Sequence, residues 1–71
     1  MGETKRINIT LNHKPCEVEA GMTISELLSL KGYPKSVAVF VNKTPLLMKA
    51  YPIYELKEAD TVTVFRPLGG G

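Results

Sequence analysis

The last three residues, Gly69, Gly70 and Gly71, are the ones whose type and spacing best suit chemistry. Glycine has no Cβ and reaches backbone conformations that are closed to other residues, so a glycine tail can lie extended in a narrow channel. Residues 66–71 would span roughly 20 Å when extended. We therefore expect the Gly71 carboxylate to enter an active site on another protein while the folded body stays outside. The alternative is a frayed chain end with no role.

A carboxylate is a poor electrophile and must be activated before a nucleophile attacks it. Adenylation by ATP is the commonest activation, and it requires a separate enzyme that binds the nucleotide. The product would be an acyl adenylate at Gly71, which a persulfide would convert into a thiocarboxylate and a thiol into a thioester. The sequence therefore predicts Gly71 as the reacting residue, with Gly69 and Gly70 as narrow, pliable access.

The remaining reactive side chains are too few for an enzyme. Cys16 and His13 are the only cysteine and histidine, and we expect Cys16 to be a small packing residue and His13 a solvated one. The seven acidic residues show no paired arrangement: Glu26 suits a helix cap, and Glu58 with Asp60 suits a solvated turn. No glycine-rich phosphate loop is present. The sequence predicts a protein that is not itself an enzyme and binds no cofactor or metal.

Length and composition exclude several classes of protein. A chain of 71 residues forms one domain. A single cysteine excludes a disulfide scaffold and a four-cysteine iron–sulfur cluster. The net charge of +2 is small, and aromatic residues do not interleave with basic ones as in nucleic-acid binders. There is no apolar stretch long enough for a membrane span and no signal peptide. We expect a cytoplasmic protein with no nucleic-acid or membrane partner, monomeric when free.

The N-terminal third reads as a hairpin followed by a helix. Residues 6–12 alternate between apolar and polar, which predicts a half-buried strand, and a turn at 12–14 leads to a second strand with Pro15 at a sheet edge. Thr23 is the expected N-cap, with Glu26 completing a capping box and Met22 contacting Leu27 in a hydrophobic staple. Gly32 ends the helix in a left-handed conformation. The residues expected to face the sheet are Ile24, Leu27, Leu28 and Leu30.

The second half supplies the other strands. Residues 37–41 are rich in β-branched side chains and predict a central strand, which turns at 42–43 into a short edge segment at 44–47. Residues 49–60 are irregular, and 61–65 form the last strand. The side chains of the irregular segment expected to pack against the sheet are Tyr51, Ile53, Tyr54 and Leu56.

These elements predict an α+β fold, in which a mixed sheet of four to five strands packs over one main helix. The first and last strands can lie parallel in its middle. The domain covers residues 1–65, and residues 66–71 form a flexible C-terminal tail.

The strand pattern also predicts a docking surface. If the valines of residues 37–41 and 61–65 face the helix, Phe40 and Phe65 point outward and form one apolar patch beside the tail. Exposed aromatic patches on small proteins are typical of interfaces. We expect Phe40, Phe65, Arg66, Pro67 and Leu68 to contact partners. The alternative is that the parity is shifted by one residue, so that both rings belong to the core; Arg66 is equally suited to a solvated position.

The order of elements and several segments resemble the ubiquitin-like sulfur carriers, and within them the bacterial thiamine-biosynthesis carriers (ThiS-like). The segments are ITLN at 9–12, TISELL at 23–28, VFVN at 39–42, EADTV at 58–62 and FRPLGGG at 65–71. The resemblance covers essentially the whole chain and implies a β-grasp fold and a cytoplasmic sulfur carrier. It implies an E1-like (ThiF-like) adenylating enzyme that uses ATP, a thiazole synthase (ThiG-like) and a sulfur donor such as a cysteine desulfurase relay.

Three other functions stay open from the sequence. The segment 65–67 also resembles the small subunit of molybdopterin synthase (MoaD-like), a sulfur carrier in molybdenum cofactor synthesis. A ubiquitin-like protein modifier would use the same activated tail to form isopeptide bonds on lysines. A β-grasp binding module would have an inert tail. Deleting Gly70 and Gly71 would abolish the function of either tail-based protein and leave that of the binding module intact.

Overall fold

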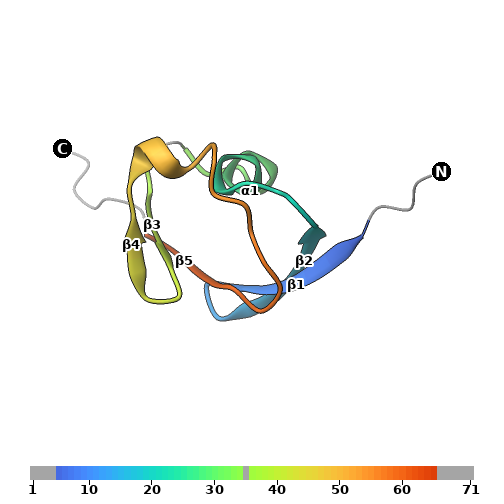
Figure 1. The fold of residues 1–71 in the computed structure, drawn as a ribbon. Helices are drawn as coiled ribbons and strands as arrows, with labels where there is room; N and C mark the ends of the chain where they lie inside the picture. Colours follow the sequence, from blue (N-terminus) through green and yellow to red (C-terminus); the bar gives the residue numbers. More distant parts are fainter. Residues whose placement is uncertain (1–4, 35, 66–71) are drawn as a thin grey trace.

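The computed structural model describes residues 5–34 and 36–65. They form a five-stranded mixed sheet with the helix α1 on one face (Figure 1). The elements are β1 (Arg6–Leu11), β2 (Lys14–Glu19), α1 (Ile24–Lys31), β3 (Ala38–Val41), β4 (Thr44–Leu46), the 3-10 helix η1 (Met48–Ala50) and β5 (Thr61–Phe65). The predicted α+β architecture is confirmed. The tail at 66–71 lies outside the described residues, so its boundary with the body stays a prediction.

The last strand lies in the middle of the sheet. The strand order is β2-β1-β5-β3-β4. β5 runs parallel to β1, with Thr61 opposite Thr10 and Val62 opposite Leu11, and antiparallel to β3. Because both neighbours hydrogen-bond to it, β5 presents its C-terminal end from the centre of the body and not from a sheet edge.

Both hairpins close through two-residue turns with left-handed backbone. Asn12 and His13 have φ values of 50° and 69°, and Asn42 and Lys43 have 52° and 71°. Such mirror-image turns match the twist of the flanking strands, and asparagine tolerates the left-handed region better than most residues. The two predicted turns are confirmed, and each places an asparagine side chain beside β5.

The signals predicted for the helix are present. The Thr23 amide donates to the Glu26 carboxylate at 2.9 Å, and the Glu26 amide donates to Thr23 Oγ1 at 3.2 Å. Gly32 ends the helix with φ 78°. This capping fixes the direction of a helix of only eight residues, which would not be stable in isolation.

Two apolar side chains expected in the core lie outside it. Leu30 is 62% exposed and Ile53 is 75% exposed. At 100° per residue, Leu30 falls well away from the stripe formed by Ile24, Leu27 and Leu28. Ile53 lies in a helical turn, in which the Tyr54 amide donates to the Ala50 carbonyl at 2.8 Å. That turn directs Tyr51 inward and Ile53 outward, and only Tyr51 is fully buried.

The core lies between the sheet and α1. Its buried members are Ile9, Leu11, Val18, Ile24, Leu27, Leu28, Val37, Val39, Val41, Tyr51, Leu56, Val62 and Val64. Five of these are the inward valines of β3, β5 and the residue before β3, as the alternation predicted. In the described part of the chain, no helix is long and apolar enough to cross a membrane.

Candidate functional site

Phe65 is the last described residue, and it marks the root from which the tail continues. The predicted reacting residue Gly71 and its access residues Gly69 and Gly70 lie outside the described residues, as do the predicted partner contacts Arg66, Pro67 and Leu68. The structure therefore describes the surroundings of the root, up to and including Phe65.

A single asparagine extends the support of β5 beyond the end of β1. Pairing between the two strands stops at Leu11 and Val62. The Asn12 amide then donates to the Val62 carbonyl at 2.9 Å, and Asn12 Oδ1 accepts from the Val64 amide at 2.8 Å. Asn12 Nδ2 donates to the Tyr33 hydroxyl at 3.2 Å. The side chain thus takes the place of the next strand residue and fixes β5 one residue before Phe65.

The start of β5 is held by a buried carboxylate. Asp60 is only 6% exposed. Its Oδ1 accepts from Asn42 Nδ2 at 3.0 Å, and its Oδ2 accepts from the Tyr54 hydroxyl at 3.2 Å and the Lys57 amide at 2.9 Å. The prediction of a solvated turn at this residue was wrong, because three donors, from the turn between β3 and β4 and from the segment before β5, converge on the carboxylate and replace its water.

Two further interactions complete this cluster. Asn42 Oδ1 accepts from the Thr61 amide at 2.9 Å, so the second turn asparagine binds the first residue of β5. Burial raises the pKa of the Tyr54 hydroxyl above its ordinary value of 10.0, and the negative charge of Asp60 and the hydrogen bond to it raise it further. The cluster fixes where β5 begins and shows no arrangement suited to acid–base catalysis.

Phe40 and Phe65 contact each other on the face of the sheet opposite the helix. Their ring centroids are 5.4 Å apart and their planes meet at 86°. Phe65 is 52% exposed, whereas its neighbour Val64 is buried. Strand register adds Ala38 opposite Phe65 and Pro45 opposite Phe40. We call Ala38, Phe40, Pro45 and Phe65 the aromatic patch. The predicted parity is confirmed, whereas the predicted role in partner binding stays a prediction.

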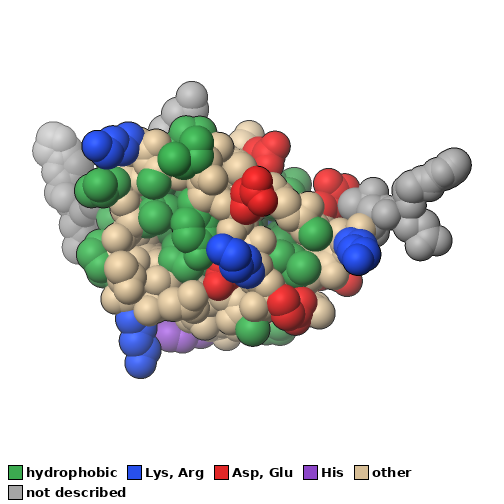
Figure 2. All heavy atoms as spheres, in the orientation of Figure 1, with side chains coloured by type: hydrophobic (Ala, Val, Ile, Leu, Met, Phe, Trp, Pro, Cys, Tyr) green, Lys and Arg blue, Asp and Glu red, His purple; other side chains and the backbone are tan. Residues whose placement is uncertain are grey.

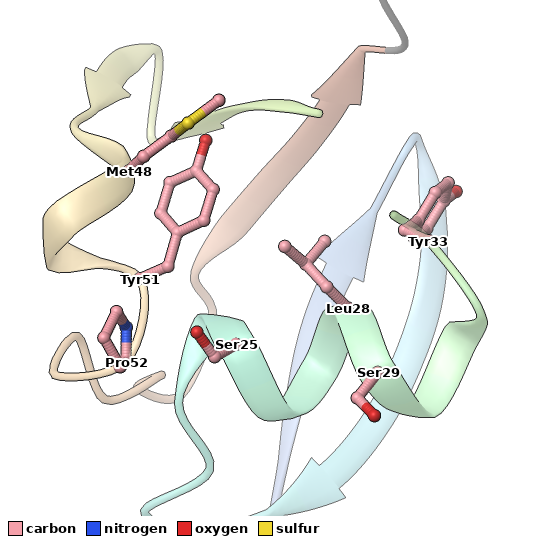
Figure 3. Close-up of a pocket in the computed structure, with 7 residues that line it drawn as sticks. All are labelled: Ser25, Leu28, Ser29, Tyr33, Met48, Tyr51 and Pro52. Atoms are coloured by element: carbon pink, nitrogen blue, oxygen red, sulfur yellow. The ribbon is translucent and has the colours of Figure 1, made fainter. Parts of the chain in front are cut away.

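The helix side carries a groove of about 430 Å³ between α1 and η1. Figure 3 shows Met48 and Tyr51 on one side of it and Leu28 with Tyr33 on the other. Tyr51 is buried, and its hydroxyl donates to the Val37 carbonyl at 2.9 Å. No acidic, basic or histidine side chain is among the described residues lining this groove. Its polar groups are hydroxyls, so it offers no acid–base or nucleophilic machinery.

The other reactive residues lie where the sequence predicted. His13 is exposed in the first hairpin turn, and Cys16 is a half-buried free thiol packed against the core. Within the ranges 5–34 and 36–65, no three His, Cys, Asp or Glu residues come together in a way that could hold a metal ion.

The chain matches a family model over residues 6–71, and that model describes the ThiS family. The chain belongs to the ThiS family. Proteins of this family are sulfur carriers, which act as co-substrates of enzymes and are not catalysts themselves. The match confirms the resemblance and the non-enzymatic role that the sequence predicted.

Two solved structures are similar to this ThiS family chain. One is the crystal structure of the thiamine biosynthesis protein ThiS from Geobacter metallireducens, with a TM-score of 0.78, 30% identity and coverage of 92% of this chain and 100% of that one. The other is a solution structure of the same Geobacter metallireducens protein, with a TM-score of 0.73, 30% identity and coverage of 92% and 88%. These similarities confirm the predicted β-grasp fold.

A curated relative is larger. The chain is 38% identical over 66 residues to a thiazole synthase from Magnetococcus marinus, an alignment that covers 92% of this chain and 20% of that protein. The chain thus spans about a fifth of the length of that relative. A segment similar to this ThiS family chain therefore occurs within a protein named for thiazole synthesis.

Proposed function

We propose that this chain carries sulfur on the C-terminal carboxylate of Gly71 for the synthesis of the thiazole of thiamine. The observation that carries the proposal is the extent of the ThiS family match, which runs from residue 6 to residue 71 and so includes the three terminal glycines with the folded body. The similarity to a thiamine biosynthesis protein over almost the whole chain, seen in its crystal and its solution structure, supports the same pathway.

The chemistry divides between the chain and its partners. An E1-like adenylating enzyme joins the Gly71 carboxylate to the AMP part of ATP, and pyrophosphate leaves. With sulfide as the nucleophile, attack on the acyl carbon expels AMP and leaves the thiocarboxylate directly. A cysteine desulfurase relay is a suitable sulfur source and supplies a persulfide. Its attack expels AMP and forms an acyl disulfide, and a second thiol then cleaves the S–S bond, so that the thiocarboxylate leaves and the two thiol sulfurs join in a disulfide. ATP is bound by the adenylating enzyme, and because the reaction consumes ATP we expect it to take place in the cytoplasm.

A thiazole synthase is the expected acceptor of the sulfur. The thiazole synthase from Magnetococcus marinus contains a segment similar to this chain, which is the arrangement expected if carrier and synthase act together. We expect the aromatic patch to contact the partners, with Phe40 and Phe65 as the central rings and Arg66, Pro67 and Leu68 following the tail into the active site. Exposed aromatic side chains lose water favourably on association and are typical anchors of interfaces.

The test is intact mass spectrometry after incubation with ATP, sulfide and the adenylating enzyme of the thiamine pathway. We expect one oxygen to be replaced by sulfur, with the change located at Gly71 by fragmentation. The matched control lacks Gly70 and Gly71 and should keep its mass. Sulfuration by the adenylating enzyme of the molybdopterin pathway alone would contradict the pathway, and no change with either enzyme would contradict sulfur carriage itself.

A further inference from the structure

Two lysines from different elements line one surface hollow. Lys14 and Lys31 face it together with Asn12, Cys16 and Tyr33, and its volume is about 310 Å³. Lys14 begins β2 opposite the buried Leu11, so it shares the helix-facing side of the sheet. Lys31 follows the buried Ile24 and Leu28 along the same stripe of α1, at the spacing of four and then three residues. A lysine therefore lies next to the core at the end of the β1–β2 hairpin and another at the end of α1.

The hollow lies beside the root of the tail. Asn12 lines it and also accepts the hydrogen bond from the Val64 amide, one residue before Phe65. Tyr33 lines it as well and accepts from Asn12. The aromatic patch lies on the other face of the same strand end, since Phe65 alternates with the inward Val64. The root of the tail therefore emerges between an apolar surface and a cationic one.

The acidic residues lie toward the opposite end of β5. Those in the described part of the chain are Glu17, Glu19, Glu26, Glu55, Glu58 and Asp60. Glu17 is opposite Asn8, which is two residues before the partner of Thr61, and Glu58 accepts from the Asn8 amide at 3.0 Å. Glu26 caps the start of α1 at Thr23, which pairs with Glu55.

The acidic end of the molecule also carries basic residues, such as Arg6 beside Glu17 and Lys57 beside Asp60, whereas the charged residues that line the hollow are basic alone. In Figure 2 the acidic side chains gather in the centre and right of the view, on the side where β1 starts, with Lys and Arg side chains among them. None of the described residues that line the hollow is acidic. Two like charges facing one hollow repel each other modestly, and an anion placed between them relieves that repulsion.

We propose that Lys14 and Lys31 form a docking surface for a carboxylate-rich rim around the opening of the adenylating enzyme that receives the tail. The proposal rests on the proposed function. A tail of six residues spans roughly 20 Å, so when Gly71 is inside the active site, the body surface around the root lies against that rim. Complementary charge at a rim speeds encounter and fixes orientation. The aromatic patch supplies the apolar contact, and the lysines select the orientation in which the tail points into the opening.

The test compares two charge reversals of equal size at opposite ends of the body. The variant Lys14→Glu/Lys31→Glu changes the hollow. The control Lys5→Glu/Lys43→Glu changes two exposed lysines at the other end of the body. Lys5 directly precedes β1, and Lys43 follows Asn42, whose amide donates to the Thr61 carbonyl at the start of β5. Each pair takes the net charge from +2 to −2, because each substitution removes one positive and adds one negative charge. Pyrophosphate release by the thiamine-pathway adenylating enzyme is measured at low and high salt.

At low salt we expect the hollow variant to raise the KM for the carrier about tenfold while the control pair changes it about twofold or less. The kcat values stay alike, and raising the salt concentration narrows the difference between the variants. Equal KM changes in both pairs would overturn the proposal, because they would report net charge alone. A change in the KM for ATP, with that for the carrier unaltered, would also overturn it, since the lysines would then serve the nucleotide.

A neutral variant separates docking from stability. Glutamate at the C-terminal end of a helix opposes the helix dipole, so Lys31→Glu can lower stability by itself. We expect Lys14→Gln/Lys31→Gln to melt like the wild type and to raise the KM for the carrier to an intermediate value. A neutral pair with wild-type KM would contradict the proposal. If the wild type is not adenylated at all, the proposed function fails, and this outcome is distinct from a failure of the docking surface.

Discussion

The two ends of β5 are held in different ways. At its start, the buried Asp60 carboxylate gathers three donors, and Asn42 binds Thr61. At its end, one neutral side chain, Asn12, takes over from a strand that has already stopped. The half-exposed Phe65 then leads toward the tail. The start carries a charged, buried network, whereas the end carries, besides its pairing with β3, one side-chain hydrogen bond and an aromatic contact.

This difference assigns the stability of the fold to the start of β5 and the presentation of the tail to its end. A buried carboxylate with several donors is costly to disturb, because every donor left without a partner adds its own desolvation penalty. A strand end with one side-chain bond can open locally without unfolding the body. We infer that the start of β5 anchors the fold, whereas its end sets the point on the body from which the tail is presented.

The largest expected effect comes from removing the anchor. Asp60→Ala leaves Asn42 Nδ2, the Tyr54 hydroxyl and the Lys57 amide without their acceptor, and we expect the free energy of unfolding to fall by about 3 kcal/mol. Urea unfolding measures the change. The control is Glu58→Ala, which removes an exposed acceptor of one backbone amide. Equal losses in the two variants would show that Asp60 is no anchor.

The two turn asparagines allow the ends to be compared directly. Asn12→Gly and Asn42→Gly both keep the left-handed turn, because glycine adopts positive φ freely. Asn12→Gly loses the bond from the Val64 amide, and we expect it to cost about 1 kcal/mol in the free energy of unfolding. Asn42→Gly loses the bond from the Thr61 amide and one donor to the buried Asp60, and we expect it to cost about 2 kcal/mol. Amide hydrogen exchange should quicken at Val64 in the first variant and at Thr61 in the second.

The same two variants also test how the end of β5 presents the tail to the loading enzyme. We expect Asn12→Gly to slow thiocarboxylate formation a few-fold, because the freed root no longer directs the tail, while Asn42→Gly loads at the wild-type rate. The conservative Asn12→Asp retains Oδ1 as an acceptor and should restore protection of the Val64 amide. Unchanged exchange at Val64 in Asn12→Gly would contradict the role assigned to this side chain.

A smaller effect on stability is expected at the aromatic patch. Phe65→Ala removes one edge-to-face ring contact from a half-exposed site, so the loss should be about 1 kcal/mol or less. Its neighbour Val64 is buried, and Val64→Ala should cost more while leaving the patch in place. Binding to the adenylating enzyme, measured by titration calorimetry, should weaken with Phe65→Ala. A larger stability loss for Phe65→Ala than for Val64→Ala would place the ring in the core.

The smallest effect concerns alkaline pH. The pKa of Tyr54 is raised above 10.0 in the folded protein, so the folded state favours the neutral hydroxyl. The stability linked to Tyr54 is complete below pH 10.0 and is lost as the pH rises through the higher folded value. Unfolding measured between neutral and strongly alkaline pH should show this decline, and Tyr54→Phe should remove part of it. A decline of the same size in Tyr54→Phe would assign it to other groups.

The parts of the fold that depend on local sequence were predictable. Alternation placed the inward valines and the outward Phe40 and Phe65. The capping box at Thr23 and the left-handed Gly32 bounded the helix, and all of these were confirmed. Local patterns failed in segments whose apolar residues are spread over more than one face. Leu30 and Ile53 are as hydrophobic as their buried neighbours, and only the helical phase of the backbone turns them outward.

The features around β5 could not be read from local patterns. Asn12 and Val64 are 52 residues apart, and a turn asparagine gives no sign of a partner at that distance. The burial of Asp60 depends on donors at Asn42 and Tyr54 that meet only in the folded chain. Lys14 and Lys31 likewise come to one hollow only through strand pairing and helix placement. The role of the terminal glycines, by contrast, was predicted from the residue type itself and stays a prediction.

The most direct test of sulfur carriage is a single-turnover transfer. The chain is first loaded to the thiocarboxylate, freed of ATP and the adenylating enzyme, and then mixed with a thiazole synthase and its other substrates. We predict that the mass of the chain returns to that of the carboxylate as sulfur appears in the thiazole in equal amount. A thiocarboxylate that persists while thiazole forms from another sulfur source would contradict the role of Gly71 as the donor.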